Sequence, residues 1–90
     1  MKTDNLFEGL RKQVVYHLRS ILLKKGGELS VNKTVKMIID DELDDAFIEK
    51  LYLNEKGEPE YQYRYAGETY VDDFILCSLD EMYNILKATD

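Results

Sequence analysis

Carboxyl groups occupy five of the six positions from 40 to 45, where the sequence reads Asp-Asp-Glu-Leu-Asp-Asp. Such a cluster could hold Ca²⁺, and an EF-hand does so with oxygen ligands at loop positions 1, 3 and 5, glycine at position 6 and a bidentate glutamate at position 12. With Asp40 as the first ligand, position 6 is Asp45 and position 12 is Leu51. This spacing excludes an EF-hand, and we expect no metal site in the run.

The other reactive side chains match no catalytic or metal-binding pattern. His17 and Cys77 are the single histidine and cysteine of the chain, which is too few soft ligands for a zinc site. Cys77 follows three apolar residues, which favours burial over nucleophilic reactivity, and His17 borders an apolar helix face, where partial burial is expected. No glycine-rich phosphate loop is present. We therefore predict no enzymatic activity and no cofactor.

Tyrosine is frequent, with seven of the 90 residues, and Tyr61, Tyr63 and Tyr65 alternate along one short segment. Alternate residues of a strand share one face of the sheet. A tyrosine platform for single-stranded nucleic acid also needs a basic groove, but the residues around this segment are mainly glutamates. We expect no nucleic acid binding. Two interpretations stay open for the tyrosines: ordinary strand residues and a protein-binding surface.

The net charge of −6 is unevenly distributed. Residues 1–36 carry a formal charge of +5 and residues 37–90 a formal charge of −11. A negative field repels phosphates and attracts basic partners, although two complementary halves also serve solubility. The single cysteine fits a reducing compartment, and no segment approaches the ~20 apolar residues that a membrane span requires. We expect a soluble, cytoplasmic protein that does not associate with membranes.

The segment from Asn5 to Gly27 has the pattern of an amphipathic helix of about 20 residues. Asn5 and Glu8 have the spacing of a capping box, and Gly26 and Gly27 supply an end signal. The positions on its apolar side are Leu6, Phe7, Leu10, Val14, Val15, Leu18, Ile21 and Leu22.

Three residues of this helix break its amphipathic pattern. Arg11 projects into the apolar side, where it must extend to solvent or pair with a carboxylate. Tyr16 and Leu23 lie together on the polar side. Two interpretations stay open for this pair: a small patch for a partner or a second copy, and the ordinary apolar content of a protein surface.

Beyond the glycines the pattern changes to the period of two that is typical of strands. We predict a strand over 28–40 with a bend at Asn32 and Lys33, the acidic run as an exposed connection, and strands over 46–54 and 60–66. The segment 69–76 is either a fourth strand or a short strand and loop.

The C-terminal segment predicts a second helix, with Ser78 and Glu81 as its capping box. Its apolar stripe comprises Leu79, Met82, Tyr83, Ile85 and Leu86. Short turns between successive strands favour antiparallel pairing. The sequence thus predicts one α+β domain over residues 1–90: a helix, an antiparallel meander of three or four strands and a second helix, with both helices on one face of the sheet.

The segment Phe-Ile-Leu-Cys-Ser-Leu-Asp-Glu-Met-Tyr-Asn-Ile-Leu-Lys-Ala, residues 74–88, resembles the closing segment of short, acidic, uncharacterised proteins of gut bacteria. Those proteins end in a pattern like Leu-Ser-x-Asp-Glu-Leu-Tyr-x-Ile-Leu, and the matching positions here are Ser78, Asp80, Glu81, Met82, Tyr83, Ile85 and Leu86. The resemblance covers about the last twenty residues, and more loosely the whole layout of helix, meander and helix. It implies a bacterial protein of this fold and no particular activity.

These observations favour a small non-enzymatic module that binds another protein, a second copy of the chain included. The surface expected to do so comprises Tyr61, Tyr63, Tyr65, Asp40, Asp41, Glu42, Asp44, Asp45, Tyr16 and Leu23. The alternative is an acidic inhibitor, immunity protein or DNA mimic that occupies a basic protein surface.

Overall fold

The chain changes from helix to strand where the spacing of its apolar residues changes from the helical period to alternation. The computed structural model describes the backbone of residues 2–89 and the side chains of residues 8–89. The elements are α1 (Lys2–Lys24), β1 (Glu28–Ile39), β2 (Glu42–Leu53), β3 (Pro59–Tyr65), β4 (Glu68–Asp73), the short 3₁₀ helix η1 (Phe74–Leu76) and α2 (Leu79–Ala88).

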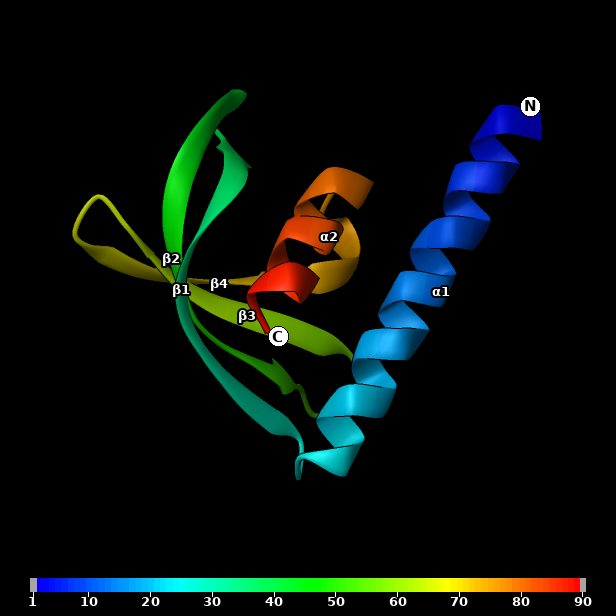
Figure 1. Ribbon diagram of the computed structural model, residues 1–90, viewed down its shortest axis with the longest axis horizontal. Helices are drawn as coiled ribbons and strands as arrows, with labels where there is room; N and C mark the ends of the chain where they lie inside the picture. Colours follow the sequence, from blue (N-terminus) through cyan, green and yellow to red (C-terminus); the bar gives the residue numbers. More distant parts are fainter. Residues whose placement is uncertain (1, 90) are drawn as a thin grey trace.

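The four strands form one antiparallel sheet in chain order. Both helices lie on the same side of this curved sheet, with α2 against it and α1 beside α2 (Figure 1). The α+β prediction is confirmed. The segment after Gly67 is a true fourth strand that continues directly into η1.

Helix α1 ends where the sequence predicts but begins earlier. At its end Gly26 and Gly27 have φ angles of 82° and 93°, and the Gly27 amide donates to the Leu22 carbonyl at 2.7 Å. Glycine adopts these left-handed angles without steric cost. The prediction that Asn5 caps the helix is wrong, because the helix already begins at Lys2. Helix propensities of ordinary residues differ by less than about 1 kcal/mol, so a capping pattern need not stop a helix.

A two-residue turn joins β1 to β2, and the acidic run is divided by it. Asp40 and Asp41 form the turn with φ angles of 52° and 65°, which tight hairpins require and aspartate tolerates. Strand β2 then begins at Glu42, four residues before the predicted start at 46. The prediction that the whole run is a connection is therefore wrong. Its second half is strand, because Leu43 continues the pairing opposite Ile38.

Bulges keep apolar residues of the long hairpin on one face. The predicted bend in β1 is confirmed: the register shifts between Ser30 and Lys33, and Asn32 has a φ of 52°. A second shift lies in β2 between Ile48 and Lys50. An extra residue reverses the in–out alternation of a strand, and for this reason Ile48 and Leu51, three positions apart, are both fully buried.

The core lies between the sheet and the two helices. Its buried members are Val14, Leu18, Leu22, Val31, Val35, Met37, Ala46, Ile48, Leu51, Tyr61, Phe74, Cys77, Met82 and Ile85. Two positions depart from the sequence expectation, since Tyr83 and His17 are both exposed. The core needs only the narrower stripe of α2 around Met82 and Ile85, and Tyr83 lies at its margin.

Polar contacts attach α2 to the edge strand β1. The predicted capping box is present, with the Glu81 amide donating to Ser78 Oγ at 3.2 Å and the Ser78 amide donating to Glu81 Oε1 at 3.0 Å. The second carboxylate oxygen of Glu81 accepts from the Ile38 amide at 3.0 Å. Asn84 Nδ2 donates to the Lys36 carbonyl at 3.3 Å. These bonds satisfy backbone groups that an edge strand otherwise presents to solvent.

Arg11 joins α1 to η1. Its guanidinium donates to the carbonyl oxygens of Ile75 and Cys77, which lie two residues apart at the end of the 3₁₀ turn. Glu8 lies 4.0 Å away on the same helix. The sequence predicted either solvent or a carboxylate as the partner of this charge, but main-chain carbonyls are its principal contacts. The planar fork of arginine suits two acceptors at once.

Candidate functional site: an acidic face lined with tyrosines

The alternating tyrosines of β3 lie on the face of the sheet that the helices cover in part. Tyr63 pairs with Tyr70 of β4, and Tyr65 pairs with Glu68. Directly opposed residues of an antiparallel pair project from the same face. Tyr61 of the same row is buried beneath the helices. The row therefore runs from the core out to the exposed end of the sheet.

The tyrosine rings stack along this row. The Tyr61 and Tyr63 ring centroids are 5.3 Å apart, and those of Tyr63 and Tyr70 are 5.4 Å apart. The interplanar angles are 27° and 26°. Offset stacking of this kind stabilises aromatic pairs beyond the area that they bury. Since the first ring is anchored in the core, the outer rings have little freedom to turn.

Each of the three outer tyrosines donates its hydroxyl hydrogen to a carboxylate. Tyr63 bonds to Asp72 at 2.9 Å, Tyr65 to Asp44 at 2.7 Å and Tyr70 to Glu68 at 2.7 Å. Asp44 comes from β2 and Glu68 from β4, so the pairs span three strands. We call this surface the acidic tyrosine face; its members are Asp40, Glu42, Asp44, Tyr63, Tyr65, Glu68, Tyr70 and Asp72.

The hydrogen bonds favour the ionised form of Asp44 and the protonated form of the phenols on this face. The Tyr65 hydroxyl, together with the Asp45 amide, lowers the pKa of Asp44. The reverse effect raises the pKa of Tyr65, and Asp40 and Glu42 add to it through their charge. The pKa of Tyr70 is raised by its bond to Glu68. At neutral pH the face therefore presents fixed negative charges between aromatic rings.

Several predicted interaction residues lie elsewhere. Tyr61 is 5% exposed and belongs to the core, so the prediction that it contributes to a binding surface is wrong. Asp41 is in the hairpin turn. Asp45 projects to the opposite face of the sheet, where it forms an ion pair with Lys36 at 2.7 Å. Alternation along β2 separates it from Asp44.

The pair on the outer side of α1 does not join this face. Tyr16 and Leu23 are 71% and 66% exposed. Tyr16 lines a groove between α1 and η1, and Leu23 is not among the residues that line it. Sequence reasoning missed Tyr70, Glu68 and Asp72, which only the pairing of β3 with β4 brings to the tyrosines. Residues 68–72 read Glu-Thr-Tyr-Val-Asp, and this alternation could have indicated that the three side chains share one face of a strand.

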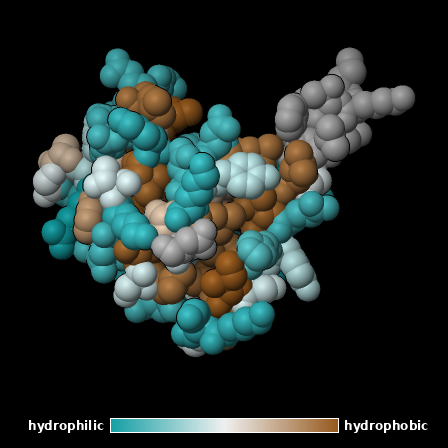
Figure 2. Space-filling view, in the orientation of Figure 1, coloured by the Kyte–Doolittle hydropathy of each residue, from teal (hydrophilic) through white to brown (hydrophobic). Residues whose placement is uncertain are grey.

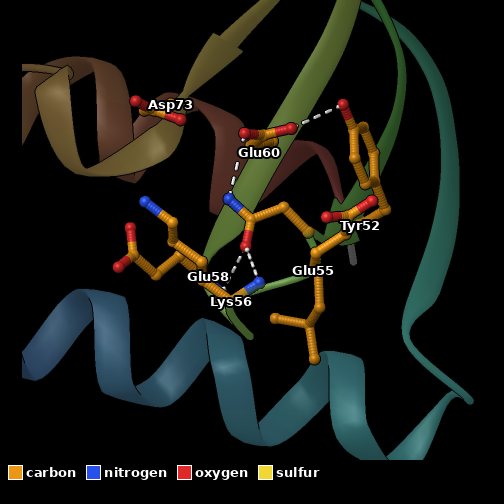
Figure 3. A pocket seen from close by; sticks show the side chains of 8 residues that line it. Tyr52, Glu55, Lys56, Glu58, Glu60 and Asp73 are labelled. Carbon is orange, nitrogen blue, oxygen red and sulfur yellow. Dashed lines mark hydrogen bonds between the residues drawn. The ribbon is translucent and has the colours of Figure 1, made fainter.

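The opposite face of the sheet carries a polar hollow of about 640 Å³ (Figure 3). Tyr52, Glu60 and Asp73 follow one another across β2, β3 and β4 by register. Tyr52 donates its hydroxyl to Glu60 at 2.8 Å, and Asn54 Nδ2 donates to the other carboxylate oxygen at 3.0 Å. The turn after β2 closes one side, since Asn54 Oδ1 accepts from the amides of Lys56 and Glu58.

The two carboxyl groups of this hollow differ in acidity. Hydrogen bonds from Asn54 and Tyr52 lower the pKa of Glu60. The bond with ionised Glu60 raises the pKa of Asp73. Burial and Glu60 raise the pKa of Tyr52 to about 12. Two carboxyl groups of different acidity, such as Glu60 and Asp73, can exchange a proton. The residues that line the hollow, however, include no cysteine, serine or histidine to act as a nucleophile.

Two further observations concern the described part of the chain. Among the described side chains, those of residues 8–89, we find no group of three or more His, Cys, Asp or Glu placed to hold a metal ion. Over residues 2–89 neither helix is long and apolar enough to cross a membrane.

Cys77 is buried, as predicted. Its thiol donates to the Tyr61 hydroxyl at 3.5 Å, and burial raises its pKa to about 11. At pH 8 native protein should react with Ellman's reagent at least about 100-fold more slowly than protein unfolded in urea, because two pKa units reduce the thiolate fraction about 100-fold. A Cys77→Ala variant gives the background rate. Equal rates in the native and unfolded states would contradict the burial.

The same shift makes stability fall at high pH. The folded-state pKa of Cys77 lies above the ordinary thiol value of 9.0, so the unfolded chain releases its proton first. This contribution to the free energy of unfolding is complete below pH 9.0 and is lost as the pH rises through about 11. Buried Tyr61, whose pKa is also raised by burial, acts in the same direction.

Comparison with protein-family models, with curated proteins and with solved structures finds no match to this chain. The resemblance of residues 74–88 to short acidic proteins of gut bacteria therefore stays a prediction.

Proposed function

We propose that this protein is a non-enzymatic interaction module of the bacterial cytoplasm, and that its acidic tyrosine face binds a basic segment of another protein. The observation that carries the proposal is the arrangement of three exposed phenol–carboxylate pairs on one face of the sheet. The free thiol of Cys77 is compatible with a reducing compartment.

Arginine and lysine are the side chains that such a face suits. A carboxylate accepts the guanidinium of arginine through two parallel hydrogen bonds. The face of a tyrosine ring attracts the same cation. Asp44 and Tyr65 present both kinds of contact side by side, joined by a hydrogen bond of 2.7 Å. One basic side chain could therefore meet a ring and a carboxylate together.

The face is also ordered before a partner arrives. Stacking on Tyr61 holds the ring of Tyr63, and the carboxylate bonds restrain Tyr65 and Tyr70. Binding then loses little side-chain entropy, which otherwise costs about 0.5–1.5 kcal/mol for each flexible side chain that is immobilised. The net charge of −6 adds long-range attraction for a basic partner.

An inhibitor, immunity protein or DNA mimic that covers a basic protein surface would use the same face. Asp40, Glu42 and Asp44 favour this second function, since they lie on the inner side of the hairpin turn next to the tyrosines. Salt dependence separates the two functions. A partner held mainly by charge loses affinity steeply with added salt, whereas one held by the rings loses little.

The test is an NMR titration of ¹⁵N-labelled protein with a capped peptide of alternating arginine and glycine. A peptide with glutamate in place of arginine serves as the probe control. We expect the arginine peptide to shift amide resonances of residues 42–45 and 63–72. The double variant Asp44→Asn/Tyr65→Phe should weaken binding by about tenfold, as expected for loss of one charge-assisted contact of about 1.4 kcal/mol.

The matched control is Asp80→Asn/Tyr83→Phe, which removes the same groups from the exposed side of α2. This variant should bind the arginine peptide as the wild type does. Equal weakening by both double variants would indicate attraction by net charge alone, and shifts spread over the whole surface would do the same. Either result would reject the acidic tyrosine face as the binding site. Tyr63 is less suitable for substitution because it packs against the core.

A further inference from the structure

A groove between α1 and η1 combines apolar walls with positively charged side chains. It has a volume of about 420 Å³ and is lined by Glu8, Arg11, Lys12, Val15, Tyr16, Arg19, Ile75 and Leu76. Leu76 and Tyr16 are 75% and 71% exposed, so apolar walls face solvent. Figure 2 shows hydrophobic atoms at the surface between α1 and the rest of the molecule.

Two cations at the rim of the groove form no ion pair with any side chain that the structure describes. Among the described side chains, neither Lys12 nor Arg19 lies within 4.0 Å of a carboxylate. The guanidinium of Arg11, in contrast, already donates to the carbonyls of Ile75 and Cys77, and its side chain forms part of the groove wall. An apolar groove with free positive charges suits an acidic segment that carries aliphatic side chains.

The tip of the β1–β2 hairpin has this composition. Ile38 and Leu43 face each other across the two strands, and they are 53% and 68% exposed. They lie on the side of the hairpin opposite to the acidic tyrosine face, because Asp44 and its neighbour Leu43 alternate. The turn beside them carries Asp40 and Asp41. Figure 1 shows that the hairpin extends beyond the rest of the sheet.

We propose that the groove between α1 and η1 binds the β1–β2 hairpin tip of a second copy of this chain. Ile38 and Leu43 of one copy enter the apolar groove beside Tyr16 and Leu76 of the next, and the turn carboxylates meet the free cations at the rim. None of the residues that line the groove comes from the hairpin. Within one chain the tip therefore does not occupy the groove, and in the proposed contact a second copy supplies it.

Tip and groove are different surfaces, so the contact is head-to-tail. Such a contact leaves a free tip on one copy and a free groove on the other, and it continues into chains unless the rotation closes a ring. This assembly goes beyond the proposed function. It uses the outer side and the turn of the hairpin, so Asp40 is the one residue shared with the acidic tyrosine face, and the other residues of that face stay accessible on every copy.

Sedimentation equilibrium of the full chain tests the proposal. The wild type should show an average mass that rises with concentration above the 10.6 kDa of one chain. A tip variant, Ile38→Ser/Leu43→Ser, and a groove variant, Tyr16→Ser/Leu76→Ser, should each stay at the mass of one chain. A mixture of the two should reach about twice that mass and stop there, since one intact tip meets one intact groove.

A matched control removes exposed apolar side chains that belong to neither surface. Leu23→Ser/Tyr83→Ser should associate as the wild type does, and circular dichroism checks that every variant is folded. A wild type that stays monomeric, variants that associate like the wild type, or a mixture without association would each overturn the proposal. A Tyr65→Phe/Tyr70→Phe variant should still associate, so this test and that of the acidic tyrosine face can fail separately.

Discussion

Replacing Phe74 with alanine is expected to lower the free energy of unfolding by about 3–5 kcal/mol, the range found for large-to-small substitutions of buried aromatic residues. Phe74 is fully buried and belongs to the core. It is also the first residue of η1, which places the carbonyls that Arg11 contacts. The loss combines the transfer of the ring with a cavity that the surrounding core cannot fill completely.

Urea denaturation followed by circular dichroism measures this loss. Small domains have a total stability of about 5–15 kcal/mol, so the variant should unfold at a much lower urea concentration. The neighbouring substitution Ile75→Ala is the matched control, because that side chain is partly exposed. It should change the stability by less than about 0.5 kcal/mol. Similar losses at both positions would show that Phe74 is not the anchor of this turn.

The second large effect is expected at Arg11. Replacement by methionine keeps an unbranched chain of similar length but removes both donors to the carbonyls of Ile75 and Cys77. Hydrogen bonds from charged groups contribute about 1.5–3 kcal/mol each. Because the Ile75 side of the contact is exposed, water can replace part of it. We therefore expect a total loss of about 2–3 kcal/mol.

Two companion variants make this result specific. Arg11→Lys keeps the charge but offers a compact ammonium in place of the planar fork, so it should retain only part of the stability. Lys12→Met makes the same kind of substitution one position along, at an exposed residue, and should have little effect. If Arg11→Met were as stable as the wild type in urea denaturation, the bridge between α1 and η1 would contribute nothing to the fold.

Most of the fold could be predicted because its local signals agree. The apolar stripe of α1, the alternation in β1, the turn residues and the capping box at Ser78 all indicate the observed elements. The ends of helices and strands were predicted less well where one sequence pattern is compatible with two structures. The Asn5 pattern reads as a cap but lies inside a helix, and the acidic run reads as a loop although half of it is strand.

The binding face was only partly predictable, since it depends on register. The sequence indicates that Tyr63 and Tyr65 share a face, but not that Tyr65 donates a hydrogen bond to Asp44 or that Tyr70 stacks on Tyr63. Two bulges decide which residues of β1 and β2 reach that face. The burial of Tyr61 follows from the position of the helices, which alternation within a single strand does not report.

The bridge from Arg11 has a consequence for how this chain can diverge. Its acceptors are main-chain oxygens, which every amino acid provides, so substitutions at Ile75 and Cys77 leave them in place. The attachment of α1 to η1 therefore depends on the side chain at position 11 and not on the side-chain types at positions 75 and 77. Related chains could change the residues at 75 and 76, and with them the shape of the groove, while this attachment is inherited intact.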